Sequence, residues 1–314
     1  MANEINYAEV YQGFIDEELE ARSYTQWMTP NEDKIEFSGG KTVKVAQLSV
    51  SGLGNYDREA ASRYPNGSVK LEWVPYEMEM DRAVRFELGR LDPNDSHFMA
   101  TTENVTREFT RTQLVPEQDL FRFSRIYNKL AASDKYKDSH IKKLAAGADV
   151  VAALSELNNK ILDDTGDMTD LVCFIALTHE PAFRAASKNN HHAIVFDRQV
   201  SVNGVAYNRG MSYDGLPCVF VPSRRMQTTV KVNDGRTEGQ TQGGIEVDAA
   251  SKQIEFMLMS SEAPIACSRI DSLKIFSADE NQTGDETTIN YHLLYDLWVL
   301  ENQVATLGAA VREG

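Results

Sequence analysis

The apolar residues between His97 and Tyr136 recur at the spacing of an α-helix. They follow one another at intervals of three and four residues in both halves of this stretch, which places them on one face of a helix. Pro116, followed within three residues by two acidic side chains, is typical of a helical first turn. The pattern therefore predicts one long helix, kinked or restarted at Pro116, with arginines along its polar side.

Alternating apolar and polar residues predict strands on either side of a polar segment. The alternation covers 42–50, 69–74 and 83–88, and a period of two residues is that of a half-buried strand. Residues 51–68 are rich in glycine and charge and contain a Pro-Asn-Gly turn. We expect a long β-hairpin with a mobile tip. Because the hairpin holds few core residues, it should pack on something outside itself.

The rest of the chain mixes helices and strands, which makes the fold class α+β. Residues 4–22 predict an amphipathic helix without a nearby partner, and such a stripe usually marks a contact. The further expected elements are helices over 145–162 and 180–188, a buried strand over 171–177, hairpin turns at 203–204, 208–210 and 214–215, a polar loop over 231–244, and strands over 254–259, 272–276 and 288–302.

Composition limits the possible functions. The 314 residues carry a net charge of −15, which argues against broad contact with phosphates. The three cysteines, Cys173, Cys218 and Cys267, lie far apart in apolar runs, so we expect buried, reduced thiols in a reducing compartment. The acidic N-terminus does not resemble a signal peptide, and the longest apolar run, 171–177, is too short to span a bilayer. We expect a protein made in the cytosol without a membrane partner.

Signs of catalysis are weak. Asp164-Thr165-Gly166 matches the triplet of aspartic proteases, but that chemistry needs two such carboxylates and the chain has one triplet. His191 and His192 point to opposite faces if extended, which disfavours a shared metal ion. Cys218 lies in an apolar strand, a poor setting for a thiolate. We expect no catalytic residue, cofactor or metal, and an α+β enzyme using Cys218 or the histidine pair remains the less favoured alternative.

Several stretches, taken in order, carry a likeness to one family. They are the entry to the hairpin (39–57, GGKTVKVAQLSVSGLGNYD), its return strand (73–95), the helix with Pro-Glu-Gln-Asp (113–127), the segment Val-Pro-Ser-Arg-Arg-Met (221–226) and two closing strands (274–277 and 295–302). Together they resemble the major capsid proteins of tailed bacteriophages, those of the Hong Kong 97 fold. The likeness spans nearly the whole chain.

The resemblance implies an α+β fold of the Hong Kong 97 type with four parts. They are an N-terminal arm (1–38), an extended β-hairpin loop (39–80), a peripheral domain with the spine helix (81–177 and 269–314) and an axial domain (178–268). It also implies a structural protein, not an enzyme, that assembles with itself into hexamers and pentamers of an icosahedral shell around double-stranded DNA. A cargo-enclosing nanocompartment of the same fold is the main alternative.

The resemblance also implies partners and a location. Because the loop strand begins by residue 42, there is no room before it for a long scaffolding extension, and we expect a separate scaffolding protein. A portal and possible decoration proteins would complete the virion, assembled in the bacterial cytoplasm, with packaged DNA contacted only weakly. Lys41, Lys44 and Lys70 lie in the loop region, but no motif identifies a crosslinking partner.

Arginines and tryptophans are the candidates for contacts between subunits. The planar guanidinium pairs with carboxylates at two points and is weakly hydrated, which suits interfaces. The candidates are Arg58, Arg63, Arg82, Arg85, Arg107, Arg111, Trp27 and Trp73. If these arginines form only ordinary surface ion pairs, each contributes roughly 0–1 kcal/mol.

Overall fold

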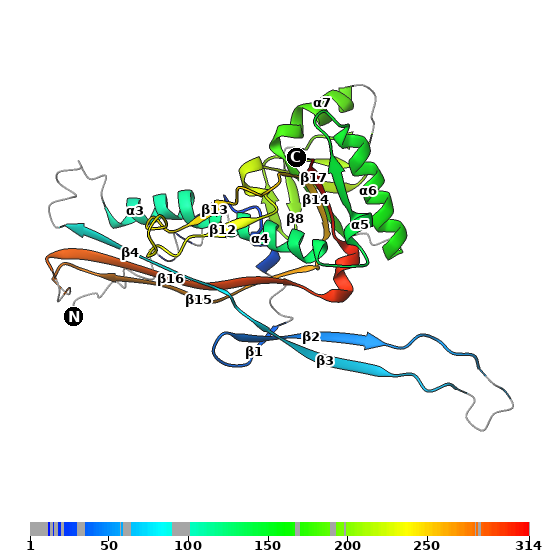
Figure 1. The fold of residues 1–314 in the computed structure, drawn as a ribbon, viewed down its shortest axis with the longest axis horizontal. Helices are drawn as coiled ribbons and strands as arrows, with labels where there is room; N and C mark the ends of the chain where they lie inside the picture. Colours follow the sequence, from blue (N-terminus) through cyan, green and yellow to red (C-terminus); the bar gives the residue numbers. More distant parts are fainter. Residues whose placement is uncertain are drawn as a thin grey trace.

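A hairpin arm, a long three-stranded sheet and a larger helix-covered sheet make up the molecule (Figure 1). The structure is a computed structural model that describes residues 12, 15, 18–19, 22–29, 35–56, 58, 64–89, 101–166, 170–188, 193–197, 199–279, 281 and 284–313. Most of the helix expected over 4–22 therefore lies outside the described residues. Among those described, no helix is both long and apolar enough to cross a membrane.

The long helix predicted around Pro116 is confirmed, and it is continuous. Helix α3 (Thr102–Phe109) leads into a π-helical segment (Thr110–Leu114) and then into α4 (Val115–Ala131). The proline has no N–H and its ring crowds the preceding turn. The wider π turn lies immediately before it, with the Val115 N–H bonded to the Thr110 carbonyl. The helix thus passes the proline by widening and does not restart.

A seven-stranded sheet forms the larger body, in the order β5-β17-β14-β6-β11-β10-β7. Its strands are β5 (Ile141–Leu144), β6 (Leu171–Ala176), β7 (Ile194–Val195), β10 (Gly210–Tyr213), β11 (Leu216–Val221), β14 (Ile254–Ser260) and β17 (Gly308–Arg312). Strand β6 is buried on both faces, as its continuous apolar run predicted. Phe174 faces the cluster that contains α4, whereas Cys173 faces the cluster that contains α6 (Val150–Thr165) and α7 (Glu180–Lys188).

The second sheet is a long antiparallel ribbon. It consists of β15 (Pro264–Phe276), β16 (Glu286–Val299) and β4 (Met80–Gly89), with β16 in the centre. Val115 and Phe121 of α4 pack against Tyr295 and neighbouring apolar residues of this ribbon. Helix α4 therefore contributes to both cores and joins the two sheets.

Smaller elements complete the fold. They are β8 (Val200–Val202) paired with β9 (Val205–Tyr207), β12 (Val230–Val232) paired with β13 (Ile245–Val247), α5 (Lys137–His140), and 3₁₀ turns at Leu177–His179, Ser223–Arg225 and Glu301–Thr306. The predicted turns at Asn203-Gly204 and Asp214-Gly215 are confirmed, with positive φ at all four residues.

Several expectations need correction. The helix expected over 145–162 is α6, which begins at Val150, capped by the Asp149 side chain, and ends at Thr165. The turn expected at 208–210 does not make a hairpin, because β9 pairs with β8 whereas β10 pairs with β11 and β7. The strand expected over 272–276 is the end of the longer β15.

The expected domain boundaries do not coincide with sheet boundaries. Strand β6, expected in the peripheral domain, pairs with β11 and β14, expected in the axial domain. Strand β15 crosses residue 268, the expected end of the axial domain.

Candidate functional site

The hairpin arm is the part of the described chain that projects furthest from the two cores (Figure 1). It consists of β2 (Thr42–Val50), β3 (Val69–Glu77) and their connection, with β1 (Ile35–Phe37) paired to the base of β2. At the base, Val43 and Val45 are fully buried, packed in clusters with residues of β15 and β16. The base of the arm is thus anchored by ordinary core packing.

The distal half of the arm is apolar and exposed. The exposed large side chains here are Val50, Leu53, Tyr56, Tyr64, Val69, Leu71 and Trp73, against five others in the rest of the described chain. Leu53 is entirely exposed, and Tyr56 contacts Tyr64 edge to face with ring centroids 5.1 Å apart. A monomer gains nothing from this arrangement, so the distal arm has the character of a contact surface.

Polar contacts fix the base of the arm. The Met78 N–H donates to the Lys41 carbonyl, and the Arg269 guanidinium donates to the Gly40 carbonyl and lies over the Phe37 ring. Asp81 lies between Lys41 (2.8 Å) and His292 (2.7 Å).

Two carboxylates near this base have opposite pKa shifts. Hydrogen bonds from Lys41 and His292 lower the pKa of Asp81. Burial raises the pKa of Asp296, although the N–H groups of Glu79 and Leu297 donate to it.

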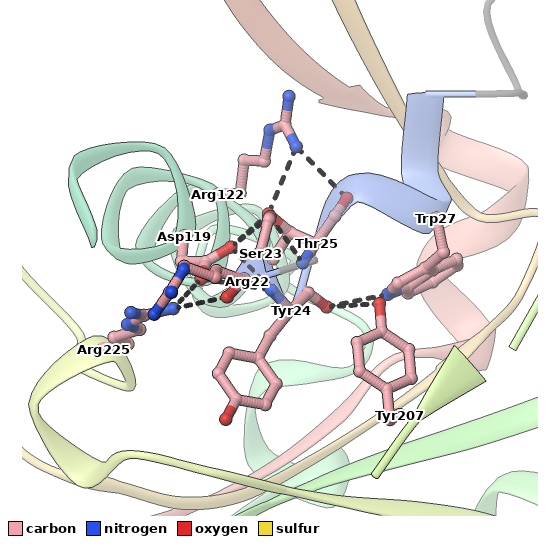
Figure 2. Close-up of polar contacts among 9 residues, drawn as sticks. All are labelled: Arg22, Ser23, Tyr24, Thr25, Trp27, Asp119, Arg122, Tyr207 and Arg225. Carbon is pink, nitrogen blue, oxygen red and sulfur yellow. Dashed lines mark hydrogen bonds and ion pairs between the residues drawn. The ribbon is translucent and has the colours of Figure 1, made fainter. Parts of the chain in front are cut away.

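A second site joins three distant parts of the chain around Asp119 of α4 (Figure 2). The Asp119 carboxylate is fully buried. It accepts hydrogen bonds from the hydroxyls of Ser23 (2.8 Å) and Thr25 (2.7 Å), and from the Tyr24 N–H. Arg225, from the 3₁₀ turn after β11, forms an ion pair with its other oxygen at 2.6 Å. We call these residues the Asp119 clasp.

Arg122 lies one helical turn further along and is also buried. Its Nη1 donates to the carbonyl and hydroxyl of Thr25, while its Nε has no hydrogen-bond partner among the described residues. The Thr25 hydroxyl in turn donates to Asp119. Burial lowers the pKa of Arg122, and the Asp119 charge opposes that shift. One buried carboxylate therefore stabilises two cations. It binds the partly buried Arg225 directly and is linked to the buried Arg122 through the Thr25 hydroxyl.

The clasp holds the N-terminal segment 22–29 against the core. Trp27 is fully buried, stacks on Phe174 of β6 at 5.7 Å and donates from its ring to the Tyr24 carbonyl. Tyr207 donates to the same carbonyl (Figure 2). Sequence reasoning missed this arrangement. No signal in the sequence links Asp119 with Arg225, which are 106 residues apart.

The structure does not gather the contact candidates into one site. Trp27 as a contact residue needs correction, because it is fully buried inside its own chain, whereas Trp73 is 45% exposed on the arm. Arg58 is exposed at the tip of the arm. Arg63 lies outside the described residues.

The other arginines have carboxylate partners within the chain. Arg82 is largely buried and binds Glu117 and the Asn233 carbonyl. The three exposed arginines each pair with a neighbour in sequence, which is Glu87 for Arg85, Glu103 for Arg107 and Glu108 for Arg111. Arg107 also lies 3.9 Å from the Glu18 carboxylate. These pairs favour the surface interpretation for Arg85, Arg107 and Arg111.

The catalytic alternatives gain no support from geometry. Cys218 is fully buried beside Cys173 on the next strand. Asp164 binds His140 and Lys160, and Gly166 ends α6 in a left-handed conformation. The pair at 191–192 lies outside the described residues. Among the residues that are described, no three metal-binding side chains gather at one place.

Comparison with solved structures identifies the fold. The capsid of cyanophage P-SCSP1u superposes with a TM-score of 0.55 at 12% identity, over 88% of this chain and 85% of that one. The mature capsid of bacteriophage PhiM1 gives 0.53 at 11%, over 88% and 83%. A virus-like particle from Pyrococcus furiosus gives 0.50 at 11%, over 98% and 100%. No protein-family model and no curated protein sequence matches the chain. The α+β fold of the Hong Kong 97 type, expected from sequence, is confirmed.

Proposed function

We propose that this protein is a structural subunit that assembles with copies of itself into a closed shell, as a bacteriophage capsid protein does. The observation that carries the proposal is the distal hairpin arm, which exposes Leu53, Tyr56, Leu71 and Trp73 on a projection beyond the subunit's own cores. The fold shared with two phage capsids and a virus-like particle supports it.

The geometry of the arm favours closed assemblies. An arm that binds a different patch on the next subunit makes a head-to-tail contact, and repeated head-to-tail contacts close into rings when the rotation allows. Hexamers and pentamers arranged as an icosahedron are the shells we propose. In them, residues 1–38 act as the N-terminal arm and 39–80 as the extended loop. The remaining chain forms a peripheral domain (81–177 and 269–314) and an axial domain (178–268).

The content and partners of the shell follow from the same proposal. A net charge of −15 suits a wall that touches packaged double-stranded DNA only weakly. We further propose a separate scaffolding protein, a portal and possible decoration proteins, with the mature protein in the virion and assembly in the bacterial cytoplasm. The protein's role is structural and not enzymatic.

A cargo-enclosing nanocompartment is a second candidate. The observation that favours it is the Pyrococcus furiosus particle, whose subunit is matched over 100% of its length by 98% of this chain. The two candidates differ in content. Particles purified from an infected or reconstituted system should contain nuclease-protected DNA if the shell is a capsid, and a bound protein cargo if it is a nanocompartment.

Assembly itself is tested by expressing the full chain with and without a candidate scaffold, and by following particles with sedimentation and electron microscopy. Leu53→Ser at the tip should unfold at the parent's temperature yet give fewer particles. The matched control is Val232→Ser, which changes an apolar side chain of 41% exposure away from the arm. A single monomer peak at every concentration with scaffold present, or equal particle yields for both variants, contradicts the proposal.

A further inference from the structure

One edge of the hairpin arm has no partner strand among the described residues. Strand β3 is the last strand in the order β1-β2-β3, so β2 covers one edge and no described strand covers the other. The pairing with β2 is continuous over all nine residues of β3, without a bulge. A long regular edge with free N–H and C=O groups is a template for another strand.

The hydrogen bonds of the arm show which residues point to the free edge. The Ser51 N–H donates to the Ser68 carbonyl, and the Met78 N–H donates to the Lys41 carbonyl. In an antiparallel ladder, alternate residues face the same neighbour, so the even-numbered residues of β3 face β2. The backbone groups of Val69, Leu71 and Trp73 therefore point outward.

Pro75 fits this alternation. Pro75 is an odd-numbered residue of β3, so its backbone nitrogen points to the free edge. The proline lacks an N–H there, and the β2–β3 ladder therefore loses no hydrogen bond. Proline is tolerated in a strand at such edge positions. It also limits the free edge, because a strand added opposite Pro75 cannot receive a hydrogen bond from it.

The side chains along this edge are self-complementary. Val69, Leu71 and Trp73 lie on one face, with exposures of 74%, 58% and 45%. Lys70 and Glu72 lie on the other face, are more than half exposed and form an ion pair with each other. When residues 69–73 of one strand run antiparallel to residues 69–73 of another, a lysine lies opposite a glutamate and a valine opposite a tryptophan.

We propose that β3 pairs antiparallel with β3 of a second copy of this chain, about a two-fold axis at Leu71. In this register Lys70 of each copy lies opposite Glu72 of the other, and Val69 lies opposite Trp73. Opposite charges and apolar pairs facing each other across strands are stabilising. The outward N–H and C=O groups of Val69, Leu71 and Trp73 then form the new hydrogen bonds.

The neighbouring registers are worse. An axis at Trp73 places Pro75 opposite Leu71, which removes a hydrogen bond on each side, and Glu72 then faces Val74. An axis at Val69 runs past the end of β3. A shift by one residue turns the inward-facing groups outward and is excluded by the pairing with β2. Leu71 is thus the centre that uses both the charges and the free backbone.

The contact is isologous and joins the two three-stranded sheets into one of six strands, β1-β2-β3-β3-β2-β1. It rests on the proposed function, since it names one contact through which copies of the chain would join in the shell. The pairing itself needs only two copies, and so it can be tested apart from shell formation.

The register is tested by disulfide formation between two single variants of the full chain, Lys70→Cys and Glu72→Cys. Across the proposed axis these positions form a non-hydrogen-bonded pair with Cα atoms about 4.5 Å apart, within the range that a disulfide bridges. The native cysteines are all buried. Copper phenanthroline in air is the oxidant: two thiols lose two electrons and two protons to oxygen as the S–S bond forms.

The mixed sample should give several-fold more covalent dimer than either variant alone, because residues 70 and 70, or 72 and 72, are diagonal neighbours about 7–8 Å apart. The unsubstituted chain is the background control. Mixed samples that give no more dimer than the single variants overturn the pairing. Particles are scored separately by sedimentation. Crosslinking without particles supports the β3 pairing and contradicts the proposed shell. Particles without crosslinking support the shell and contradict the β3 pairing.

A charge exchange provides the second test. Lys70→Glu and Glu72→Lys each place like charges opposite each other twice, so each variant alone should pair roughly tenfold more weakly. Mixing the two variants restores both pairs between copies while the ion pair within each chain stays broken. Recovery on mixing, read by native mass spectrometry in the presence of the parent as control, is the expected result. Failure to recover shows that the charges act within one chain and overturns the register.

Discussion

The N-terminal segment 22–29 and the distal half of the hairpin arm use the same kinds of residue in opposite ways. In the first, Trp27 is fully buried and stacked on Phe174. In the second, Trp73 is 45% exposed, next to Leu71 at 58%. The polar groups differ in the same way, because Asp119 makes several hydrogen bonds around segment 22–29, whereas the outer edge of β3 has no described partner strand.

The difference separates what stabilises the subunit from what is available to join subunits. A contact completed within the chain, such as the Asp119 clasp, contributes to the folding free energy of each copy. An exposed apolar edge contributes almost nothing to folding and becomes useful only when a second molecule covers it. Substitutions in the two regions should therefore affect different measurements, stability in one and assembly in the other.

The largest expected effect is that of Asp119→Ala. It leaves the buried Arg122 and the partly buried Arg225 without their shared anion, and breaking a buried ion pair in this way costs roughly 3–5 kcal/mol. Urea unfolding of the unassembled chain measures the loss. The control is Glu87→Ala, which removes an exposed carboxylate paired with Arg85 and should change stability by less than about 1 kcal/mol. Equal stability of both variants would show that the clasp is not a stabilising site.

The two tryptophans give the most direct comparison. Trp27→Ala removes a fully buried ring and should destabilise the chain by about 3–5 kcal/mol. Trp73→Ala removes an exposed ring and should change the unfolding free energy by less than about 1 kcal/mol, while lowering the yield of particles. Thermal unfolding and sedimentation are measured on both variants. A large stability loss for Trp73→Ala, or normal particle yield, contradicts the distinction between the two regions.

Much of the fold was predictable because its signals are local. The helix around Pro116, the buried strand at 171–176, the helix at 180–188 and the glycine turns all depend on periodicity or on one positive φ. What no pattern revealed was the π-helical segment, since Thr110–Leu114 has no distinctive composition. The sheet order, in which β6 pairs with β11 and β14, was not predicted either, because strand pairing between distant segments leaves no local signal.

The candidate site was predicted less well, and the reason is again physical. A side chain's partner depends on tertiary contacts, so the sequence could list Arg82 and Trp27 but could not place them inside the chain. Trp73 was selected together with Trp27 on the same grounds, and only burial separates them. The Asp119–Arg225 pair lies 106 residues apart in sequence, a distance over which no spacing rule applies.

A graded series of arginine substitutions extends the comparison to smaller effects. Arg82 is partly buried with Glu117 and the Asn233 carbonyl, and Arg82→Ala should cost about 1–3 kcal/mol. Arg107→Ala and Arg111→Ala remove exposed pairs and should each cost less than about 1 kcal/mol. Urea unfolding ranks the stability losses of the three variants, and particle yield is measured on the same samples. If Arg107→Ala or Arg111→Ala folds normally but forms no particles, that arginine contacts a neighbouring subunit despite its pairing within the chain.

The smallest expected effect is a pH dependence at the base of the arm, where the two regions meet. Hydrogen bonds from Lys41 and His292 lower the pKa of Asp81 below its ordinary value of 3.8. Asp81 therefore contributes stability above that value and loses it as the pH falls through the lowered pKa. The side chain is 37% exposed, so solvent screening keeps the contribution below about 1 kcal/mol.

Asp296, close to the same base, should show the opposite slope. Burial raises its pKa above 3.8, so its contribution is present at low pH and declines as the pH rises through the raised pKa. Urea midpoints measured for the parent and for Asp81→Asn between about pH 2.5 and 6 test the sign of the Asp81 contribution to stability. The difference between the two chains should shrink on acidification, since both are then neutral at residue 81. Because Asp81 joins the arm to the ribbon and does not touch the clasp, the same difference should persist when Ser23→Ala is added to both chains. A difference that grows on acidification would contradict the lowered pKa of Asp81. A difference that disappears with Ser23→Ala would mean that the base of the arm and the clasp are not independent.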